Sequence, residues 1–230
     1  MINIIIPVHN EEKLIEKTLT ILENKLFREY RIIVVDDFST DRTRDIVGKI
    51  AVYNKNIELI SNAFKTGIAG ALKTGFERAD RDSVVVPVMG DLCDQPETIE
   101  QMYNKIQEGY DIVCASRYTK GGRRIGGPIL KGLASRYLSR FIYLLYKFHC
   151  SDPTNSFKMY RKNVLDNIDI ESRGFEVSLE LILKAKLLGY KITEVSTTWK
   201  DRETGESKFR NFRDGWRYFK WLIFIVKGCS

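Results

Sequence analysis

The stretch Ile4-Ile5-Ile6-Pro7-Val8-His9-Asn10-Glu11 is an apolar run that stops abruptly at polar residues. Two later stretches repeat this pattern: Ile32-Ile33-Val34-Val35-Asp36-Asp37 and Val84-Val85-Val86-Pro87-Val88-Met89-Gly90-Asp91. Near-continuous apolar runs are typical of strands buried on both faces of a parallel sheet. Ligands of such sheets bind beyond the carboxyl ends of the strands. The polar residues that end the runs are therefore the first candidates for a functional site, and their carboxylates suggest a bound cation with its phosphate.

The rest of the chain alternates between helical and extended periodicity. Strands are expected over 1–8, 31–35, 57–60, 84–89 and 191–195, and helices over 14–22, 46–50, 68–78 and 177–188. This alternation predicts an α/β protein with a doubly wound, mostly parallel sheet flanked by helices. Proline cannot donate to a central ladder, so a bulge or an edge position is expected near Pro87.

The composition limits the classes of binding partner and the cellular compartment that are expected. The chain has 230 residues and a formal net charge of +7, which fits one globular domain with anionic partners. No helix-turn-helix, zinc or RNA-binding signature is present, so nucleic acid is not an expected partner. The four cysteines lie far apart without a Cys-x-x-Cys pair, which favours a reducing, cytosolic setting. The first eight residues are interpreted as a strand and not as a signal peptide, and no apolar run reaches the roughly 20 residues that span a bilayer.

Two groups of strand-end acids are candidates for chemistry. Asp36 and Asp37 could meet a ribose, a base or a cation, although capping of the following turn is an equally good interpretation. Met89-Gly90-Asp91 is similar to the Asp-x-Asp signature with which nucleotide-sugar enzymes hold a divalent cation. Because a thioether is a poor ligand for hard cations, Asp91 would hold the metal with phosphate oxygens and water, helped by Asp94.

The segment 116–140 contains no acidic residue. Its basic residues are Arg117, Lys120, Arg123, Arg124, Lys131, Arg136 and Arg140. A solvated basic surface would explain this composition, but two polyanions that must meet face to face would also require such a concentration of positive charge.

Taken together, motifs spread over nearly the whole chain resemble family 2 glycosyltransferases, and most closely those that use dolichyl or other polyprenyl phosphates. The motifs are Pro7-Val8-His9-Asn10-Glu11-Glu12, Asp36-Asp37-Phe38-Ser39-Thr40-Asp41, Lys65-Thr66-Gly67-Ile68-Ala69-Gly70-Ala71, Gly90-Asp91-Leu92-Cys93-Asp94-Gln95-Pro96, Ser116-Arg117-Tyr118, Asp152-Pro153-Thr154-Asn155-Ser156-Phe157-Lys158, Gly174-Phe175-Glu176-Val177-Ser178-Leu179-Glu180 and Asp201-Arg202-Glu203-Thr204-Gly205-Glu206-Ser207-Lys208. The chain departs from the family pattern at Met89, where an acid is usual, and at Cys93, where many relatives carry glutamine.

The resemblance implies a GT-A fold, an inverting displacement and a set of site residues. The residues implied around the nucleotide sugar, a GDP- or UDP-hexose, are Pro7, His9, Glu11, Asp36, Asp37, Gly67, Gly90, Asp91 and Lys208. Those implied in catalysis are Asp91, Arg117 and Arg202, and those implied at the acceptor phosphate are Arg117, Lys131 and Ser135. Asp91 and Asp94 would hold Mg²⁺ or Mn²⁺. Glu176 and Glu180, four residues apart on one helix face, would orient sugar hydroxyls or steady a loop.

Two amphipathic segments raise the question of a membrane. Apolar residues recur at helical spacing between 133 and 148, and again over 209–230, with arginines and lysines between them. Aromatic and basic composition suits a bilayer interface, whereas core packing or a partner are the alternatives. We expect a GT-A domain over 1–208 and a membrane-interface tail over 209–230, with peripheral attachment to the cytoplasmic face of a membrane.

The leading hypothesis is transfer of a hexose to a polyprenyl phosphate, with mannose from GDP-mannose as the first choice. A second hypothesis keeps the donor and uses a saccharide hydroxyl as acceptor, which would require a general base such as Glu180 or Asp94. A third, suggested by Met89, is a non-catalytic nucleotide-sugar-binding protein.

Overall fold

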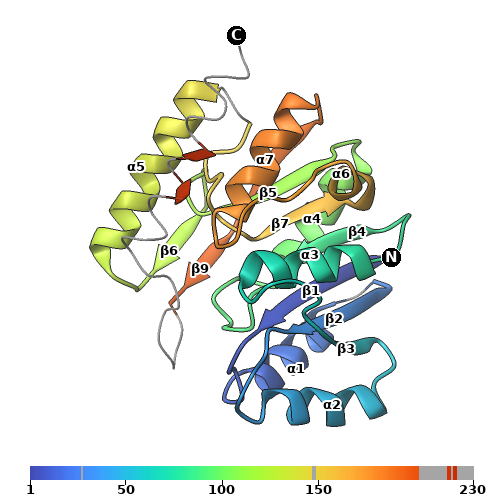
Figure 1. Ribbon diagram of the computed structural model, residues 1–230. Coiled ribbons are helices and arrows are strands. Elements are labelled where there is room, and N and C mark those ends of the chain that lie inside the picture. Colours follow the sequence, from blue (N-terminus) through green and yellow to red (C-terminus); the bar gives the residue numbers. More distant parts are fainter. Residues whose placement is uncertain (27, 147–148, 202–216, 219, 222–230) are drawn as a thin grey trace.

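The computed structural model describes residues 1–26, 28–146, 149–201, 217, 218, 220 and 221, and only the backbone of residues 131, 145 and 146. A seven-stranded sheet with the order β3-β2-β1-β4-β7-β5-β8 forms its centre (Figure 1). The strands are β1 (Ile2–Val8), β2 (Tyr30–Asp36), β3 (Ile57–Ser61), β4 (Val84–Pro87), β5 (Ile112–Ser116), β7 (Lys158–Arg161) and β8 (Ile192–Ser196). β6 (Arg123–Ile125) and β9 (Thr198–Lys200) form a separate parallel pair.

Most of the sheet is parallel, as predicted. β3, β2, β1 and β4 run in parallel, and β5 and β8 form a second parallel pair. β7, which the sequence did not reveal, lies between these two blocks and is antiparallel to both β4 and β5. The doubly wound, mostly parallel α/β architecture is therefore confirmed, with one antiparallel strand inserted in its middle.

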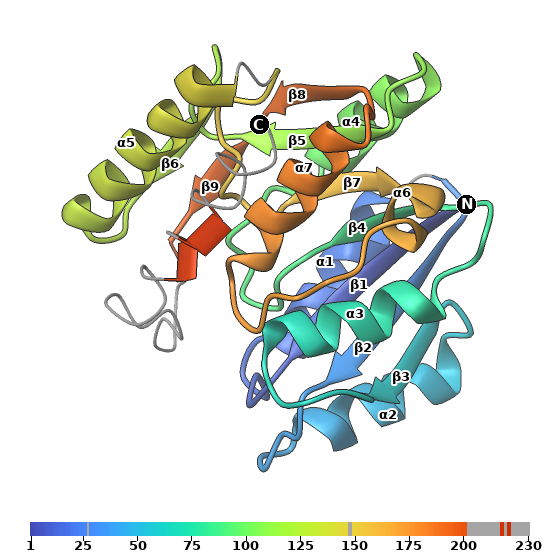
Figure 2. The same cartoon turned by 45° about the horizontal axis from the view of Figure 1, so that its top comes forward.

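Helices cover both faces of the sheet. They are α1 (Ile15–Lys25), α2 (Thr43–Tyr53), α3 (Ile68–Arg78), α4 (Thr98–Gln107), α6 (Lys162–Asp166) and α7 (Val177–Leu187), together with α5 (Ile129–Tyr146). Strand side chains alternate between faces, so Ile4 and Ile6 of β1 join the core under α1, α2 and α4, whereas Ile5 joins the core under α3 and α7. The view in Figure 2 shows α3 and α7 on the same side of the sheet.

Pro87 corrects one expectation. β4 is an interior strand and not an edge strand, because it pairs with β1 on one side and β7 on the other. Pro87 is its last residue, and the ladder with β7 includes only Val84 and Val85. The next amide, that of Val88, donates to Ile5 of β1 at 2.9 Å. The missing N–H of Pro87 therefore falls on the side where pairing has already ended.

The loops at the carboxyl ends of the strands carry unusual backbone conformations. Asn10, Phe38 and Leu92 have φ values of 53°, 59° and 58°, and they follow β1, β2 and β4, respectively. A left-handed backbone conformation is strained for residues other than glycine. It is kept only where contacts with the surrounding structure enforce it. They are the first sign that this end of the sheet is specialised.

Helix α5 lies to one side of the sheet, near the small β6–β9 pair (Figures 1 and 2). Its inner face contributes Ile142 and Leu138 to the core. Its outer side chains are exposed, among them Ile129, Leu130, Leu133, Tyr137, Phe141 and Leu144. The helix predicted within 133–148 is thus present and starts earlier. Among the described residues, no helix is long and apolar enough to cross a membrane.

The predicted tail over 209–230 lies mostly outside the described residues. Of its described members, Tyr218 and Trp221 are buried against the core that contains α7. At these two positions the core-packing alternative applies. The amphipathic pattern of the remaining tail stays a prediction.

Candidate functional site

Two carboxylates follow the end of β2 and two follow the end of β4, and we call Asp36, Asp37, Asp91 and Asp94 the carboxylate edge. Asp37 is buried, and its two oxygens accept hydrogen bonds from the Asn62 side chain at 2.7 Å and from the backbone N–H of Gly67 at 2.9 Å. It thereby ties the loop after β2 to the loop that precedes α3.

Asp36 has a different set of contacts. One oxygen accepts the backbone N–H of Ser39 at 3.3 Å, and the other lies 3.4 Å from the Arg44 guanidinium of α2. The turn-capping interpretation therefore describes what Asp36 does in the structure. A direct contact of Asp36 with a nucleotide stays a prediction.

The residues after β1 lie beside this pair. His9 Nδ1 lies 2.7 Å from the carbonyl oxygen of Asp37, and the backbone N–H of Glu11 donates to Thr43. Pro7 pairs with Val35 in the ladder between β1 and β2. The predicted nucleotide-side residues of the first two loops are thus brought together.

Two glycines belong to the same region. Gly67 has a φ of 130°, and a Cβ atom there would lie 2.9 Å from the carbonyl oxygen of Arg173. Any side chain would therefore be strained and would collide with the backbone. Gly90 lies against Val8 and Glu11, and its carbonyl accepts the Thr18 hydroxyl. Both glycines allow loops from different parts of the sequence to meet at one edge of the sheet.

Asp91 and Asp94 form the part of the carboxylate edge predicted to hold a metal. Burial, followed by the charge of Asp91, raises the pKa of Asp94 to about 7. Its Oδ1 atom is inaccessible and has no hydrogen-bond partner within the described part of the chain. A divalent cation would relieve the repulsion between the two carboxylates and give this oxygen a partner.

The remaining ligands of such a cation would have to come from elsewhere. Within the described ranges, no three His, Cys, Asp or Glu side chains gather closely enough to hold a metal ion. Mg²⁺ commonly binds through one or two carboxylates plus substrate phosphates and water. The two aspartates fit this mode and not a site built from protein ligands alone.

A second constellation surrounds Arg117 directly after β5, and we call Arg117, Ser135, Asp152 and Thr154 the Arg117 cluster. Arg117 donates through Nε to Asp152 at 2.7 Å and through Nη2 to Asp152 at 2.9 Å and Ser135 at 3.3 Å. The hydroxyl of Ser135, on α5, also accepts a hydrogen bond from the Tyr118 hydroxyl at 3.1 Å. Burial by itself lowers the pKa of Arg117, but the Asp152 carboxylate outweighs it and raises the pKa above its ordinary value.

Glu176, the residue before α7, and Glu180, within its first turn, have different contacts. Glu180 is fully buried, and its oxygens accept the backbone N–H groups of Glu171 and Ser172, each at 2.8 Å, beside the ammonium of Lys184. Of its two predicted roles, the structure supports the steadying of a loop. Glu176 accepts two backbone N–H groups through Oε1, whereas its buried Oε2 has no hydrogen-bond partner among the described residues.

Three predicted site residues are not placed by the structure. Arg202 and Lys208 lie outside the described residues, and only the backbone of Lys131 is described. Conversely, sequence reasoning gave no role to Asn62 or Asp152. Asp152 begins the motif at 152–158, but nothing in the sequence signals its pairing with a residue 35 positions earlier.

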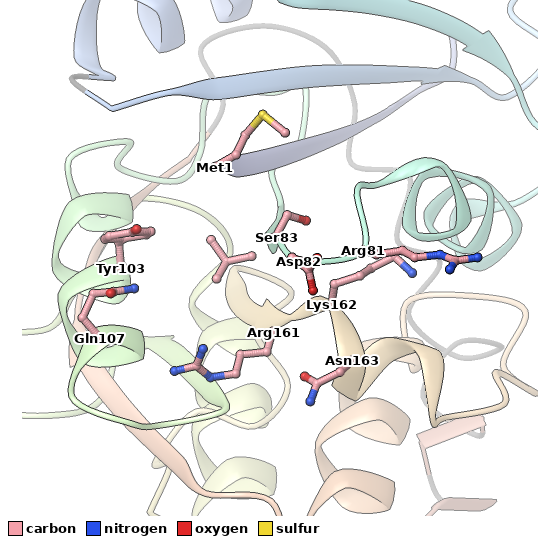
Figure 3. A pocket seen from close by; sticks show the side chains of 10 residues that line it. Met1, Arg81, Asp82, Ser83, Tyr103, Gln107, Arg161, Lys162 and Asn163 are labelled. Carbon is pink, nitrogen blue, oxygen red and sulfur yellow. The ribbon is translucent and has the colours of Figure 1, made fainter.

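A cavity lies away from all of these groups. It has a volume of about 320 Å³ and is lined by Met1, Ser83, Tyr103 and Arg161 among others (Figure 3). Met1 and Ser83 precede β1 and β4, so this cavity is at the amino ends of the strands. None of the predicted site residues lines it.

Comparison with known structures defines the class of fold. Glucosyl-3-phosphoglycerate synthase from Mycobacterium tuberculosis, solved with Mn²⁺, UDP and glucosyl-3-phosphoglycerate, matches with a TM-score of 0.73. The match has 17% sequence identity and covers 97% of this chain and 78% of that one. The fold is therefore that of the GT-A glycosyltransferases.

Sequence comparison then identifies the family. Residues 3–169 match the family described as glycosyl transferase family 2, and the chain belongs to this family. Dolichol-phosphate mannosyltransferase of Pyrococcus furiosus is 31% identical over 229 residues, which cover 96% of this chain and 64% of that protein. Undecaprenyl-phosphate mannosyltransferase of Micrococcus luteus is 30% identical over 211 residues, which cover 89% of this chain and 85% of that protein. The chain thus spans just under two thirds of the length of the archaeal relative.

Proposed function

We propose that this glycosyltransferase moves a hexose, mannose from GDP-mannose as the first choice, from a nucleotide sugar to a polyprenyl phosphate. The names of the two relatives support both the sugar and the acceptor class. The structural observation that carries the proposal is the position of Ser135. This residue contacts Arg117 and belongs to α5, the helix that exposes a row of apolar side chains.

A lipid phosphate fits this arrangement because its two ends need different surroundings. The anionic head would meet the Arg117 cluster, and the apolar chain would run along the outer face of α5 or into a bilayer beneath it. Leu133, Tyr137 and Phe141 are 45%, 70% and 54% exposed, and exposed apolar residues grouped in this way mark an interaction surface. We therefore also propose peripheral attachment of the enzyme to the cytoplasmic face of a membrane.

The proposed reaction is a single displacement at the anomeric carbon. An oxygen of the acceptor phosphate forms the new bond to this carbon, and the bond to the nucleoside diphosphate breaks, so that the diphosphate leaves with the electron pair. A phosphate monoester is largely ionised at neutral pH, since its second pKa lies near 6. The acceptor is therefore already nucleophilic, and the protein needs mainly to position two anions.

The predicted residues divide this task. Asp37, Gly67 and the loop after β1 would bind the nucleotide, and Arg117 with Ser135 would bind the acceptor phosphate. Asp91 and Asp94 would hold a divalent cation, Mg²⁺ or Mn²⁺, which supplies positive charge to the leaving diphosphate. Roles for Lys131, Arg202 and Lys208 in binding phosphate groups, and for Glu176 in orienting the sugar, remain part of this proposal.

The proposal is tested by a transfer assay with purified protein, a divalent cation and a short polyprenyl phosphate. Radiolabelled GDP-mannose, UDP-glucose and UDP-N-acetylglucosamine are supplied in parallel. We expect label from GDP-mannose to move into the organic phase, and Asp91→Ala to abolish the transfer. Asp82→Ala, an exposed aspartate at the amino ends of the strands, is the matched control. Absence of transfer from every donor, despite measurable nucleotide binding, would refute the proposal.

One observation favours a second candidate acceptor. A saccharide hydroxyl needs a general base with a pKa near neutrality, and Asp94 has a pKa of about 7. The same assay with water-soluble saccharides in place of the lipid would reveal this activity, and absence of transfer to every saccharide would rule it out.

A further inference from the structure

Asp152 is a buried carboxylate at the centre of the Arg117 cluster. It is fully inaccessible, and besides the two guanidinium hydrogen bonds it accepts the backbone N–H of Arg117 at 3.1 Å. The side chain and the main chain of Arg117 are thus fixed by one partner. Such two-pronged pairing with a carboxylate defines both the direction and the rotation of a guanidinium plane.

The loop that carries Asp152 is itself firmly anchored. The ammonium of Lys158, which is fully buried, donates to the carbonyl oxygens of Pro153, at 3.0 Å, and Asn155. The side chain of Asn155 donates to the carbonyl oxygen of Ala115 in β5 at 2.8 Å. A buried cation is costly unless it has such partners. Lys158, together with Asn155, therefore holds this loop against β5, the strand that ends just before Arg117.

A second anchor holds the other side of this loop. Glu194 of β8 accepts both the backbone N–H and the hydroxyl of Ser151, at 2.6 and 2.8 Å. The Ser151 hydroxyl also lies 2.7 Å from that of Ser116, the residue that precedes Arg117. Asp152 is therefore positioned from both directions along the chain.

The hydrogen bonds of Arg117 leave one part of its guanidinium available. Nε and Nη2 are engaged by Asp152 and Ser135, whereas Nη1 has no hydrogen-bond partner among the described residues. The Arg117 side chain is 13% exposed, in contrast to the fully buried Asp152 carboxylate. A phosphate would thus bind the Nη1 side, while Asp152 holds the opposite side.

We propose that Asp152 is a positioning residue of the transfer reaction, which aims Arg117 at the acceptor phosphate and offsets part of its charge. This inference rests on the proposed function, in which Arg117 binds that phosphate. Offsetting the charge weakens the grip on the phosphate in the ground state, whereas aiming aids the transition state. Removal of the carboxylate should therefore lower kcat without raising the KM for polyprenyl phosphate.

The test uses Asp152→Asn in the polyprenyl-phosphate transfer assay. The amide keeps the shape but loses the charge and one of the two acceptor oxygens. We expect kcat to fall roughly 10–100-fold, because a displaced catalytic group commonly costs this much. The KM for polyprenyl phosphate should stay unchanged or decrease, and the number of nucleotide-binding sites per chain, measured by titration calorimetry, should stay unchanged.

Asp111→Asn is the matched control. Asp111 lies at the other end of β5, where its Oδ1 is 3.7 Å from the Arg161 guanidinium. The same chemical change beside another arginine should leave both kinetic constants within about twofold of the unmodified enzyme, as surface ion pairs contribute little.

A double-mutant cycle separates positioning from general destabilisation. If Asp152 acts through Arg117, Asp152→Asn should cost little additional rate in an Arg117→Gln background. An equal loss in both backgrounds would overturn the inference, and so would kinetics of Asp152→Asn that match those of Asp111→Asn. No transfer by the unmodified enzyme would refute the proposed function, and the inference with it. An active enzyme with an unaffected Asp152→Asn variant would refute the inference alone.

Discussion

Asp37 of the carboxylate edge and Arg117 of the Arg117 cluster lie at the same end of the sheet but hold their charges by opposite means. Asp37 is an anion whose partners are a side-chain amide and a backbone N–H, so its charge is not cancelled by a cation. Arg117 is a cation whose main partner is a buried carboxylate. The first arrangement fixes loops while leaving negative charge at the edge. The second fixes a side chain and leaves little net charge behind.

This difference determines what is lost when a partner of Asp37 or of Arg117 is removed. Hydrogen bonds from neutral donors survive as long as the loop conformation survives. A buried ion pair, in contrast, leaves an uncompensated charge when one member is removed, which typically costs about 3–5 kcal/mol. Substitutions in the two regions should therefore have effects of different magnitude, and they should affect different properties of the protein.

The largest effect is expected from Arg117→Ala. Transfer to polyprenyl phosphate should fall roughly 1000-fold, because a preorganised cation at the acceptor is lost, whereas nucleotide-sugar affinity should change less than about threefold. The free energy of unfolding should also decrease, by about 3–5 kcal/mol, since Asp152 is left buried without its partner. Steady-state kinetics, calorimetric nucleotide binding and denaturant unfolding measure the three quantities.

Arg117→Lys provides the check on this result if the alanine variant folds poorly. It keeps the charge but cannot reproduce the two-pronged contact with Asp152. An intermediate loss of transfer is expected. Equal losses of transfer and nucleotide affinity in either variant would instead assign Arg117 to the donor.

A smaller effect is expected from Asp37→Asn. The amide can satisfy only one of the two donors, Asn62 and Gly67, so the loop before α3 loses an anchor. A hydrogen bond to a charged group contributes about 1.5–3 kcal/mol, which corresponds to roughly 30-fold weaker nucleotide binding. Calorimetry with a nucleoside diphosphate measures it, and Asp45→Asn, an exposed position in the first turn of α2, is the control. If both variants bind alike, Asp37 does not support the nucleotide site.

Local sequence patterns predict part of this fold, and tertiary contacts determine the rest. The first half of the fold follows from local patterns: apolar strands, helical periodicity and polar residues at each strand end. β7 was missed because Lys158 is part of it, and a buried lysine in a strand breaks the apolar pattern on which prediction depends. Its antiparallel place between β4 and β5 is set by tertiary pairing and not by its own residues.

The candidate site shows the same limit. Arg117 was indicated by the acid-free basic segment and by the family motif Ser116-Arg117-Tyr118. The strand-end rule identified Asp37 and Asp91, since each follows the carboxyl end of a predicted strand. It could not identify Asp152, whose pairing with Arg117 crosses 35 residues. Nor could helical spacing distinguish Glu176 from Glu180. The spacing gives their common face, whereas their hydrogen-bond partners come from the preceding loop.

The exposed face of α5 belongs to the helix that contributes Ser135 to the Arg117 cluster. Phe141 is 54% exposed on this helix, and Phe141→Ser should weaken binding to anionic vesicles about tenfold, as expected for partial burial of a large apolar side chain. Vesicle flotation at low salt measures the change. Tyr53→Ser, at the end of α2 and 91% exposed, controls for surface hydrophobicity in general. Equal effects of both substitutions, or no flotation of the unmodified protein, would contradict a specific role of α5.

The effect most particular to the carboxylate edge concerns pH. In the metal-free protein the pKa of Asp94 is about 7, compared with an ordinary value of 3.8. Between these values the folded state holds a proton that the unfolded state has released, so the free energy of unfolding should fall as pH rises from about 4 to about 7. Asp94→Asn should remove up to about 1.4 kcal/mol per pH unit of this slope. Denaturant unfolding of both proteins at pH 5, 6, 7 and 8 in the presence of a chelator measures it. Parallel pH curves for the two proteins would mean that Asp94 is already ionised without a cation, and that the repulsion between Asp91 and Asp94 is relieved by the protein itself.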